Sequence, residues 1–194
     1  MINEREKFVH WNYFLAFDVD AEKLSRYIEF TADNFEAYSI EMARLLLSAA
    51  SEVDVVAKLL CSKIDSSSRA ENIRDYREIL NTILPKIKDM KVHIRRHGLE
   101  LTPWDNWKHN RTPDWWTSYN DVKHARNINF RQANLKNTLN AIAGLFCLLL
   151  YYHKAEAEAE AGDLIPNPNL FILSSEFLGP SIITGGGFRI TYRL

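Results

Sequence analysis

The chain has 194 residues, of which 46% are hydrophobic and 25% are charged, values ordinary for a soluble globular protein. This length fits one domain that buries its own core without the support of disulfides or metals. A formal net charge of −1 at pH 7 excludes a global basic excess, so nucleic acid or a membrane surface would have to meet a local patch.

The two cysteines, Cys61 and Cys147, each lie inside an apolar helical pattern. We expect both to be free and buried, which suits a reducing cytosol, and a bridge between them is the alternative. No pair of Cys or His residues has the spacing of a zinc site. We therefore expect no metal and no cofactor.

The N-terminal segment, residues 1–14, is acidic and aromatic. It lacks the basic segment, the apolar core and the small-residue cleavage site of a signal peptide. The longest apolar run, residues 141–152, is shorter than the roughly 20 residues that cross a bilayer. We expect a cytoplasmic protein with no membrane partner, in which this run forms a buried core helix.

Hydrophobic periodicity predicts four or five helices, the first of them short and covering residues 21–30. The next helix is the best marked. Asp33 and Glu36 resemble a capping box at its start, and an apolar stripe with steps of three and four carries it to about Ile64. The stripe consists of Phe35, Tyr38, Met42, Leu45, Ala49, Val53, Val56 and Leu60.

A second capping pattern, Ser68 with Glu71, predicts a helix over residues 72–84 that Pro85 ends. Further along, the Thr-Pro-Asp triplet at 112–114 combines a capping hydroxyl, a proline suited to the first helical position and an acid in the first turn. These features predict another helix, which carries the most suggestive residues of the chain.

The last long helix is predicted to begin near Asn129 or Gln132 and to be apolar nearly all round beyond Ala141. Such a helix should be central, because each of its faces needs a neighbour. Its stripe consists of Leu135, Leu139, Ile142, Phe146 and Leu149. The glutamate-rich continuation, residues 153–163, places negative charge at a helix C-terminus, so we expect it to fray and to be exposed.

Residues 90–102 alternate around a glycine and predict a short hairpin. Two more β-like segments, Leu170–Leu173 and Phe188–Arg193, flank a glycine-rich turn and pair either with each other or with the hairpin. We therefore predict a mostly α (α+β) fold: an antiparallel helical bundle with a small β hairpin or sheet from residues 90–102 and the C-terminal tail. The chain is expected to be a single domain over 1–194, with a helical core at about 20–160 and a β-like extension at about 168–194.

The stretch PDWWTSYNDVKHAR, residues 113–126, presents two faces when it is placed on a helix. The face expected to pack inward consists of Trp115, Tyr119 and Val122. The second face gathers an aromatic ring, an amide and a cation, with an imidazole one turn after the amide. It consists of Trp116, Asn120, Lys123 and Asn127, with His124 and Arg126 nearby.

This second face has the groups that bind or cleave a phosphate ester. Lysine and arginine supply positive charge, and histidine transfers protons near neutral pH. Cleavage of RNA without a metal needs a base, an acid and a cation of this type. The competing interpretation is a solvated helix edge without any chemistry.

Three other clusters have a functional and a structural interpretation. The first is the basic segment HIRRH, which is interpreted either as a phosphate contact or as an exposed strand. Its basic residues are His93, Arg95, Arg96 and His97. The segment WDNWKHNR, with His109 and Arg111, stacks bases or closes the end of the bundle through its tryptophans. The TGGG sequence at 184–187 lacks the lysine and the helix of a phosphate-binding loop, so a hairpin turn is the better interpretation.

The sequence WWTSYNDVKHAR, followed by ANLKNTLNAIAGLFCLLLYY and preceded by YSIEMARLLLSAASEVDVVAKLLC, carries a resemblance. Over roughly residues 8–152 the chain resembles a group of uncharacterised bacterial proteins with a WWxxYNxVKHxR pattern. That group in turn resembles the HEPN superfamily of all-helical bundles, which are usually dimers and often belong to antiviral defence and toxin systems. Many members are metal-independent ribonucleases.

The HEPN motif reads arginine, a polar residue, about three further residues and histidine. Asn120 and His124 match it here, whereas Tyr119 stands where the family has the arginine that holds phosphate. Lys123 is one substitute for that cation, and Arg126 from a dimer partner is another. The motif is thus degenerate, as it also is where such domains only bind.

The resemblance and the residues leave three functions open. The first is a non-catalytic module of a bacterial defence or stress system that binds RNA, a nucleotide or a protein. Its binding residues would be Lys123, Arg126, Arg131 and Trp116. The second is a metal-independent endoribonuclease at a homodimer cleft, with His124, Asn120 and Lys123 as its catalytic residues. The third is a purely structural helical protein, in which Asn120 and His124 bond to the backbone of neighbouring helices.

Overall fold

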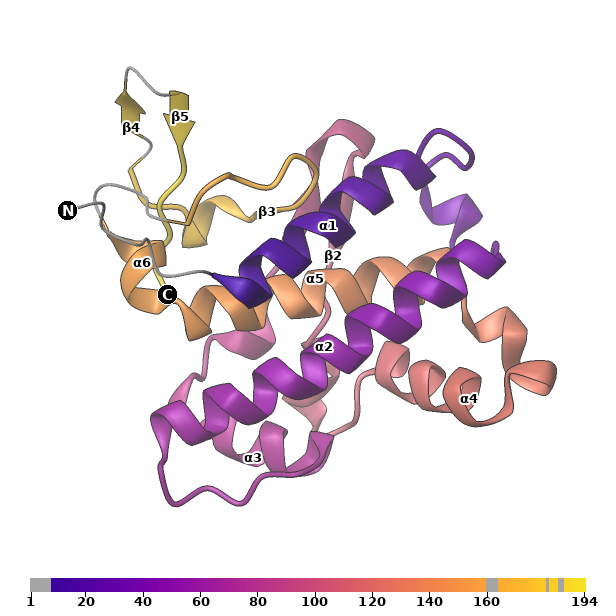
Figure 1. Ribbon diagram of the computed structural model, residues 1–194, viewed down its shortest axis with the longest axis horizontal. Coiled ribbons are helices and arrows are strands. Elements are labelled where there is room, and N and C mark those ends of the chain that lie inside the picture. Colours follow the sequence, from indigo (N-terminus) through magenta and orange to yellow (C-terminus); the bar gives the residue numbers. More distant parts are fainter. Residues whose placement is uncertain (1–7, 160–163, 181, 185–186) are drawn as a thin grey trace.

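The fold is mostly α with small β additions, as the sequence predicts (Figure 1). The computed structural model describes residues 8–159, 164–180, 182–184 and 187–194. The α-helices in this part of the chain are, in order, α1 (Val9–Leu24), α2 (Ile40–Ile64), α3 (Ile73–Ile83), α4 (Asp114–Asn129), α5 (Leu135–Tyr152) and α6 (Lys154–Glu158).

Helix α5 runs through the middle of the molecule, and α1, α2 and α4 all pack against it (Figure 1). This confirms the central position predicted from its sequence. By length and composition α5 is also apolar enough to cross a membrane, but 83% of it is buried inside the fold. Its apolar surface is therefore already covered by neighbouring helices. The two cysteines are buried and free, as expected.

The first helix begins much earlier than predicted, so the expected helix over residues 21–30 is wrong. Helix α1 ends at Leu24 and buries a stripe at steps of three and four that starts with Trp11, Phe14 and Phe17. Those aromatic residues pack against the core, which therefore extends well before residue 20. The aromatic character of the N-terminal segment was the signal of a buried helical face.

Helices α2 and α3 begin at caps other than those predicted. The Ser39 hydroxyl accepts the N–H of Met42 at 3.1 Å and starts α2, whereas Asp33 lies in a separate 3-10 turn. The Asn72 side chain accepts two N–H groups and starts α3. The predicted end of α2 at Ile64 is confirmed, and α3 ends just before Pro85, also as predicted.

Helix α4 begins at Asp114, one residue later than predicted, because Pro113 occupies the N-cap position and not the first helical position, and no side chain caps the helix. Helix α5 is capped by Asn134 and not by either of the two earlier residues proposed. After α5 the chain breaks at His153 and starts the separate helix α6. The expected exposure is confirmed for Lys154, Ala155 and Glu158, whereas Ala157 is buried against the core. The rest of the predicted continuation, residues 160–163, lies outside the described residues.

The predicted hairpin at residues 90–102 is present. Strands β1 (Val92–Ile94) and β2 (Leu99–Leu101) pair antiparallel, with Val92 opposite Leu101. Between them the chain needs Gly98, whose φ of 66° lies in the left-handed region that favours glycine.

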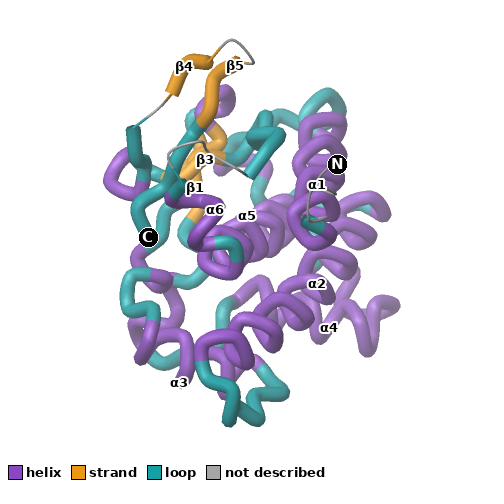
Figure 2. Tube along the Cα trace, turned by 60° about the vertical axis from the view of Figure 1, so that its left-hand side comes forward, coloured by secondary structure: helices purple, strands orange, loops and turns teal. Residues whose placement is uncertain are grey.

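The C-terminal tail adds strands to two sheets. Strand β3 (Ile172–Leu173) pairs antiparallel with the free edge of β1, placing Ile172 opposite His93 and giving the order β2-β1-β3. Strands β4 (Ile182–Thr184) and β5 (Gly187–Arg189) form a separate antiparallel pair at the edge of the molecule (Figure 2). The predicted pairing of the first tail segment with the hairpin is therefore confirmed, whereas the second segment pairs with Ile182–Thr184, which was not predicted as a strand. The glycine-rich turn at 184–187 includes residues outside the described part.

Candidate functional site

The inward face predicted for α4 is confirmed, since Trp115, Tyr119 and Val122 are all buried. Trp116 is buried as well, with only 6% of its surface exposed. Its ring contacts the Tyr119 ring edge to face at 5.4 Å between centroids. Most of the Trp116 ring is therefore covered, which leaves little area for stacking on a base.

Asn120 and Lys123 line a groove of about 620 Å³ between α4 and the start of α3. The Lys123 ammonium lies 5.3 Å from the centre of the Tyr119 ring. The groove also contains one other cation, Arg74, and more carboxylates than cations. These carboxylates belong to Asp54, Glu71, Asp75 and Glu78. The excess of negative charge repels a phosphate group, so the electrostatics oppose the role predicted for Lys123.

The remaining residues of the predicted site point elsewhere. Helix α4 loses helical geometry at Ala125, where φ is −146° and ψ is 54°. Beyond this break Arg126 lines a different hollow of about 560 Å³ with Phe130, and Arg131 is exposed in the turn before α5. His124 is exposed and lines neither hollow.

Within the described residues, the side chains of Asn120 and His124 make no hydrogen bond, so the predicted network that locks the bundle is not formed there. The predicted set therefore separates into three places. Only Asn120, Lys123 and the edge of Trp116 share a hollow. Because α4 breaks at Ala125, residues that are close in its sequence do not come together in one site.

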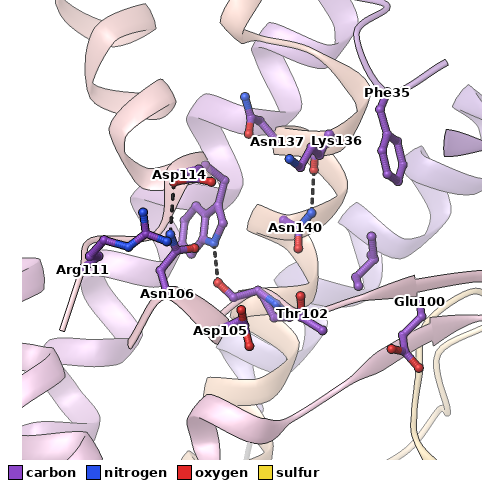
Figure 3. A pocket seen from close by; sticks show the side chains of 13 residues that line it. Phe35, Glu100, Thr102, Asp105, Asn106, Arg111, Asp114, Lys136, Asn137 and Asn140 are labelled. Carbon is purple, nitrogen blue, oxygen red and sulfur yellow. Dashed lines mark hydrogen bonds between the residues drawn. The ribbon is translucent and has the colours of Figure 1, made fainter. Parts of the chain in front are cut away.

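A different cleft, missed in the sequence, lies where the loop of residues 102–111 meets α4 and the first half of α5 (Figure 3). It holds about 300 Å³, the lower end of the range for small-molecule sites. Figure 3 shows Lys136 and Asn140 of α5 facing Asn106 and Arg111 of the loop. Phe35 borders the cleft on the side away from Arg111.

Tryptophans hold the wall of this cleft in place. The Trp115 indole N–H donates to the carbonyl of Pro103 at 2.8 Å, and the Trp104 indole packs edge to face against Trp115 at 5.3 Å. Trp107 is buried beside Trp104. The WDNWKHNR segment thus closes the end of the bundle, as its structural interpretation proposed, and it also presents Arg111 to the cleft.

The two cations of the cleft, Arg111 and Lys136, make no ion pair among the described residues. Two carboxylates that line the same cleft form ion pairs with lysines that lie outside it. Lys91 pairs with Glu100 at 2.9 Å and lowers the pKa of that carboxyl by its hydrogen bond. The carboxylate of Asp105 forms an ion pair with Lys108 at 2.9 Å.

The third carboxylate, Asp114, accepts the Asn106 amide at 3.1 Å. Since two of the three acids are paired with lysines outside the cleft, the charges left without an ion partner are those of Arg111, Lys136 and the Asp114 carboxylate, one more cation than anion. The cleft therefore fits an anionic group better than the acidic groove at Lys123 does.

The basic HIRRH segment does not form a free patch. Arg96 pairs with Glu22 at 3.0 Å, and His97 lies 3.2 Å from Glu29. His93 lies beside Glu100. Acids thus face three of the four basic side chains, and Arg95 is exposed without an ion pair among the described residues. This arrangement agrees with the structural interpretation of the segment. Within the described residues, no group of three or more His, Cys, Asp or Glu side chains is arranged to hold a metal ion.

The chain matches no protein-family model, and no curated protein or solved structure is significantly similar to it. The assignment of a function therefore depends on the chemistry of the cleft. One signal for the cleft was present in the sequence: Lys136, Asn137 and Asn140 interrupt an otherwise apolar helix. Asn137 is buried, and a buried polar side chain in such a helix needs a specific reason.

Proposed function

We propose that this chain is a non-catalytic helical module that binds a nucleotide in the cleft between the 102–111 loop and α5. The observation that carries the proposal is the pair of cations, Arg111 and Lys136, without ion partners on either side of a preformed polar cleft. Unpaired guanidinium and ammonium groups are the usual ligands of a phosphate in proteins.

The aromatic ring of Phe35 supports a nucleotide over a simple phosphate. Phe35 is half-buried, borders the cleft (Figure 3), and stacks on no other aromatic ring of the described residues. A free ring face beside polar groups offers a surface for a base. The size of the cleft, about 300 Å³, favours one nucleotide over a folded RNA, and a net charge of −1 agrees with a small ligand.

Binding to mononucleotides tests the proposal directly. Titration calorimetry of the purified chain with CMP and AMP should show saturable binding that weakens as salt increases. Arg111→Ala and Lys136→Ala should each lower the affinity about tenfold or more, because a hydrogen bond to a charged group contributes about 1.5–3 kcal/mol. Lys123→Ala removes the same charge from the acidic groove and serves as the matched control. Equal effects of all three substitutions, or no binding, would contradict the proposal.

Membership of the HEPN superfamily, a homodimer, and a place in bacterial defence or stress remain proposals. They are supported by the pattern WWxxYNxVKHxR and agree with the mostly helical fold. A nucleotide-binding role is compatible with them, since the degenerate motif favours binding over catalysis.

A further inference from the structure

Three asparagine side chains that line the cleft donate hydrogen bonds from their amide NH₂ groups to other groups of the protein. Asn137 donates to the carbonyl of Gln132 at 2.9 Å and to the Ser118 hydroxyl at 3.0 Å. Asn140 donates to the carbonyl of Lys136 at 2.9 Å. These acceptors fix the orientation of both amides, because a carbonyl oxygen accepts hydrogen bonds and never donates them.

The third amide, on Asn106, donates to the carboxylate of Asp114 at 3.1 Å, which fixes its orientation for the same reason. Because each NH₂ group donates to the protein, the side-chain oxygen of each amide remains available to accept a hydrogen bond. None of the three oxygens accepts a hydrogen bond from another described residue. Asn137 is about nine-tenths buried and lines the cleft, so its held amide leaves the oxygen as an acceptor that a ligand in the cleft can use.

The cleft therefore offers several oxygen acceptors, whereas its charged donors are Arg111 and Lys136. If a phosphate occupies those two cations, the rest of the ligand meets oxygens that require donors. Among the bases, cytosine, adenine and guanine carry an exocyclic amino group, which donates, whereas uracil and thymine carry only exocyclic carbonyl oxygens, which accept. A carbonyl set against an amide oxygen leaves both without a partner.

We propose that the cleft selects a nucleotide whose base carries an exocyclic amino group, and that Asn106, Asn137 and Asn140 are the residues that determine this specificity. The inference rests on the proposed nucleotide-binding function and adds the identity of the base. A comparison of CMP with UMP tests this selection, because the two nucleotides share the ring size, the ribose and the phosphate and differ only in the groups on the pairing edge of the base.

Titration of the full chain with CMP and with UMP under identical salt tests the selection. CMP is expected to bind about tenfold more tightly or better, since one well-placed base contact discriminates by roughly that factor. Equal affinity for the two nucleotides, or a preference for UMP, overturns the selection while leaving the proposed function intact. Binding of neither nucleotide overturns the proposed function and this inference with it.

Variants assign the selection to the amides. Asn140→Ala and Asn106→Ala should each reduce the ratio of CMP to UMP affinity several-fold, mainly by weakening CMP. Asn127→Ala, an exposed asparagine of α4 outside the cleft, should leave the ratio unchanged. Circular dichroism melting confirms that each variant is folded, and folded cleft variants that keep the wild-type ratio overturn the role of the amides.

Discussion

The Asp18 carboxylate accepts the backbone N–H of Leu170 at 3.0 Å, across 152 residues of chain. The same side chain accepts the N–H groups of Asn169 at 2.7 Å and Phe171 at 3.3 Å, and it is 1% exposed. Helix α1 therefore holds the start of the C-terminal tail through one buried side chain. This anchor places β3 where it can pair with β1.

Replacing Asp18 should release the tail. Asp18→Asn keeps the size of the side chain but puts an NH₂ group against backbone donors, so we expect a loss of about 1–3 kcal/mol in the free energy of unfolding. Urea denaturation measures this loss, and hydrogen exchange should show faster exchange at Asn169, Leu170 and Phe171. Asp33→Asn, on an exposed turn, is the control. A wild-type midpoint for Asp18→Asn would contradict the anchoring role.

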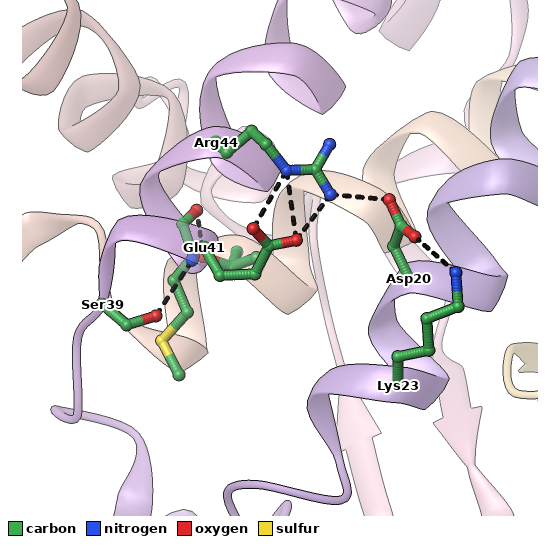
Figure 4. A network of polar contacts seen from close by, with 7 residues as sticks. Asp20, Lys23, Ser39, Glu41 and Arg44 are labelled. Atoms are coloured by element: carbon green, nitrogen blue, oxygen red, sulfur yellow. Dashed lines mark hydrogen bonds and ion pairs between the residues drawn. The ribbon is translucent and has the colours of Figure 1, made fainter.

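The ion pairs of Arg44 should make stability depend on acid and on salt. Arg44 joins α2 to α1, with its guanidinium 2.5 Å from Glu41 and 2.7 Å from Asp20 (Figure 4). Its hydrogen bond lowers the pKa of Glu41. For Asp20, burial raises the pKa, but the hydrogen bonds from Arg44 and Lys23 outweigh it and lower the pKa overall.

Because both carboxyls hold protons less tightly in the folded state, their contribution to stability is present above their ordinary pKa values of 4.5 and 3.8. It is lost as the pH falls below these values. Arg44→Ala should therefore cost about 0.2–1 kcal/mol at pH 7, since all three side chains remain partly exposed to solvent, and little at pH 2 or in 1 M salt. Unfolding curves at both pH values measure the difference, and a cost independent of pH would contradict this account.

Gly144 is a close-packing position in α5. A Cβ atom there would lie 3.1 Å from the Trp115 ring and 3.3 Å from the Trp104 ring. Gly144→Ala should therefore destabilise the fold by about 1–3 kcal/mol through overpacking, partly offset by about 0.5–1 kcal/mol of helix propensity. Thermal unfolding measures the net loss. In a double-mutant cycle with Trp104→Phe the cost should shrink, and strict additivity would exclude the Trp104 contact as its cause.

His124 should be dispensable for stability and for RNA integrity. The side chain is exposed and makes no hydrogen bond among the described residues, so His124→Ala should change the free energy of unfolding by no more than about 0.5 kcal/mol. Mixed RNA incubated in EDTA with the wild type or with His124→Ala should give identical patterns on a gel. Cleavage by the wild type alone would instead support the endoribonuclease alternative.

Local patterns predicted much of the helical fold. The stripe from Met42 to Leu60 is buried as predicted, because a helix that buries one face must repeat apolar residues at that period. Helix starts were less predictable. Ser39 and Asn72 were the caps, while nearby residues such as Asp33 matched the same pattern, since capping depends on backbone geometry that neighbouring segments fix.

The candidate site shows where such patterns stop being informative. Asn120, Lys123 and Arg126 follow one another on α4, yet the break at Ala125 separates Arg126 from the other two. Lys123 appeared to be a phosphate ligand, but the carboxylates that surround it lie up to about 70 positions away in the chain, beginning with Asp54. The electrostatic potential at Lys123 depends on all charges of the surrounding surface, and that surface is formed by segments that are far apart in the sequence.

The sequence by itself determined the buried stripes of α2 and α5, because periodicity and apolar content are properties of a single segment, but not the buried face of α1 that begins at Trp11. It determined a central α5, the inward face of α4 and the hairpin at residues 90–102. Only the tertiary structure decided which cations lack a partner and which amides have a free oxygen. Arg111 faces Lys136 across the cleft (Figure 3) because the tryptophans position the loop against α5, and contacts between segments so far apart leave no local pattern.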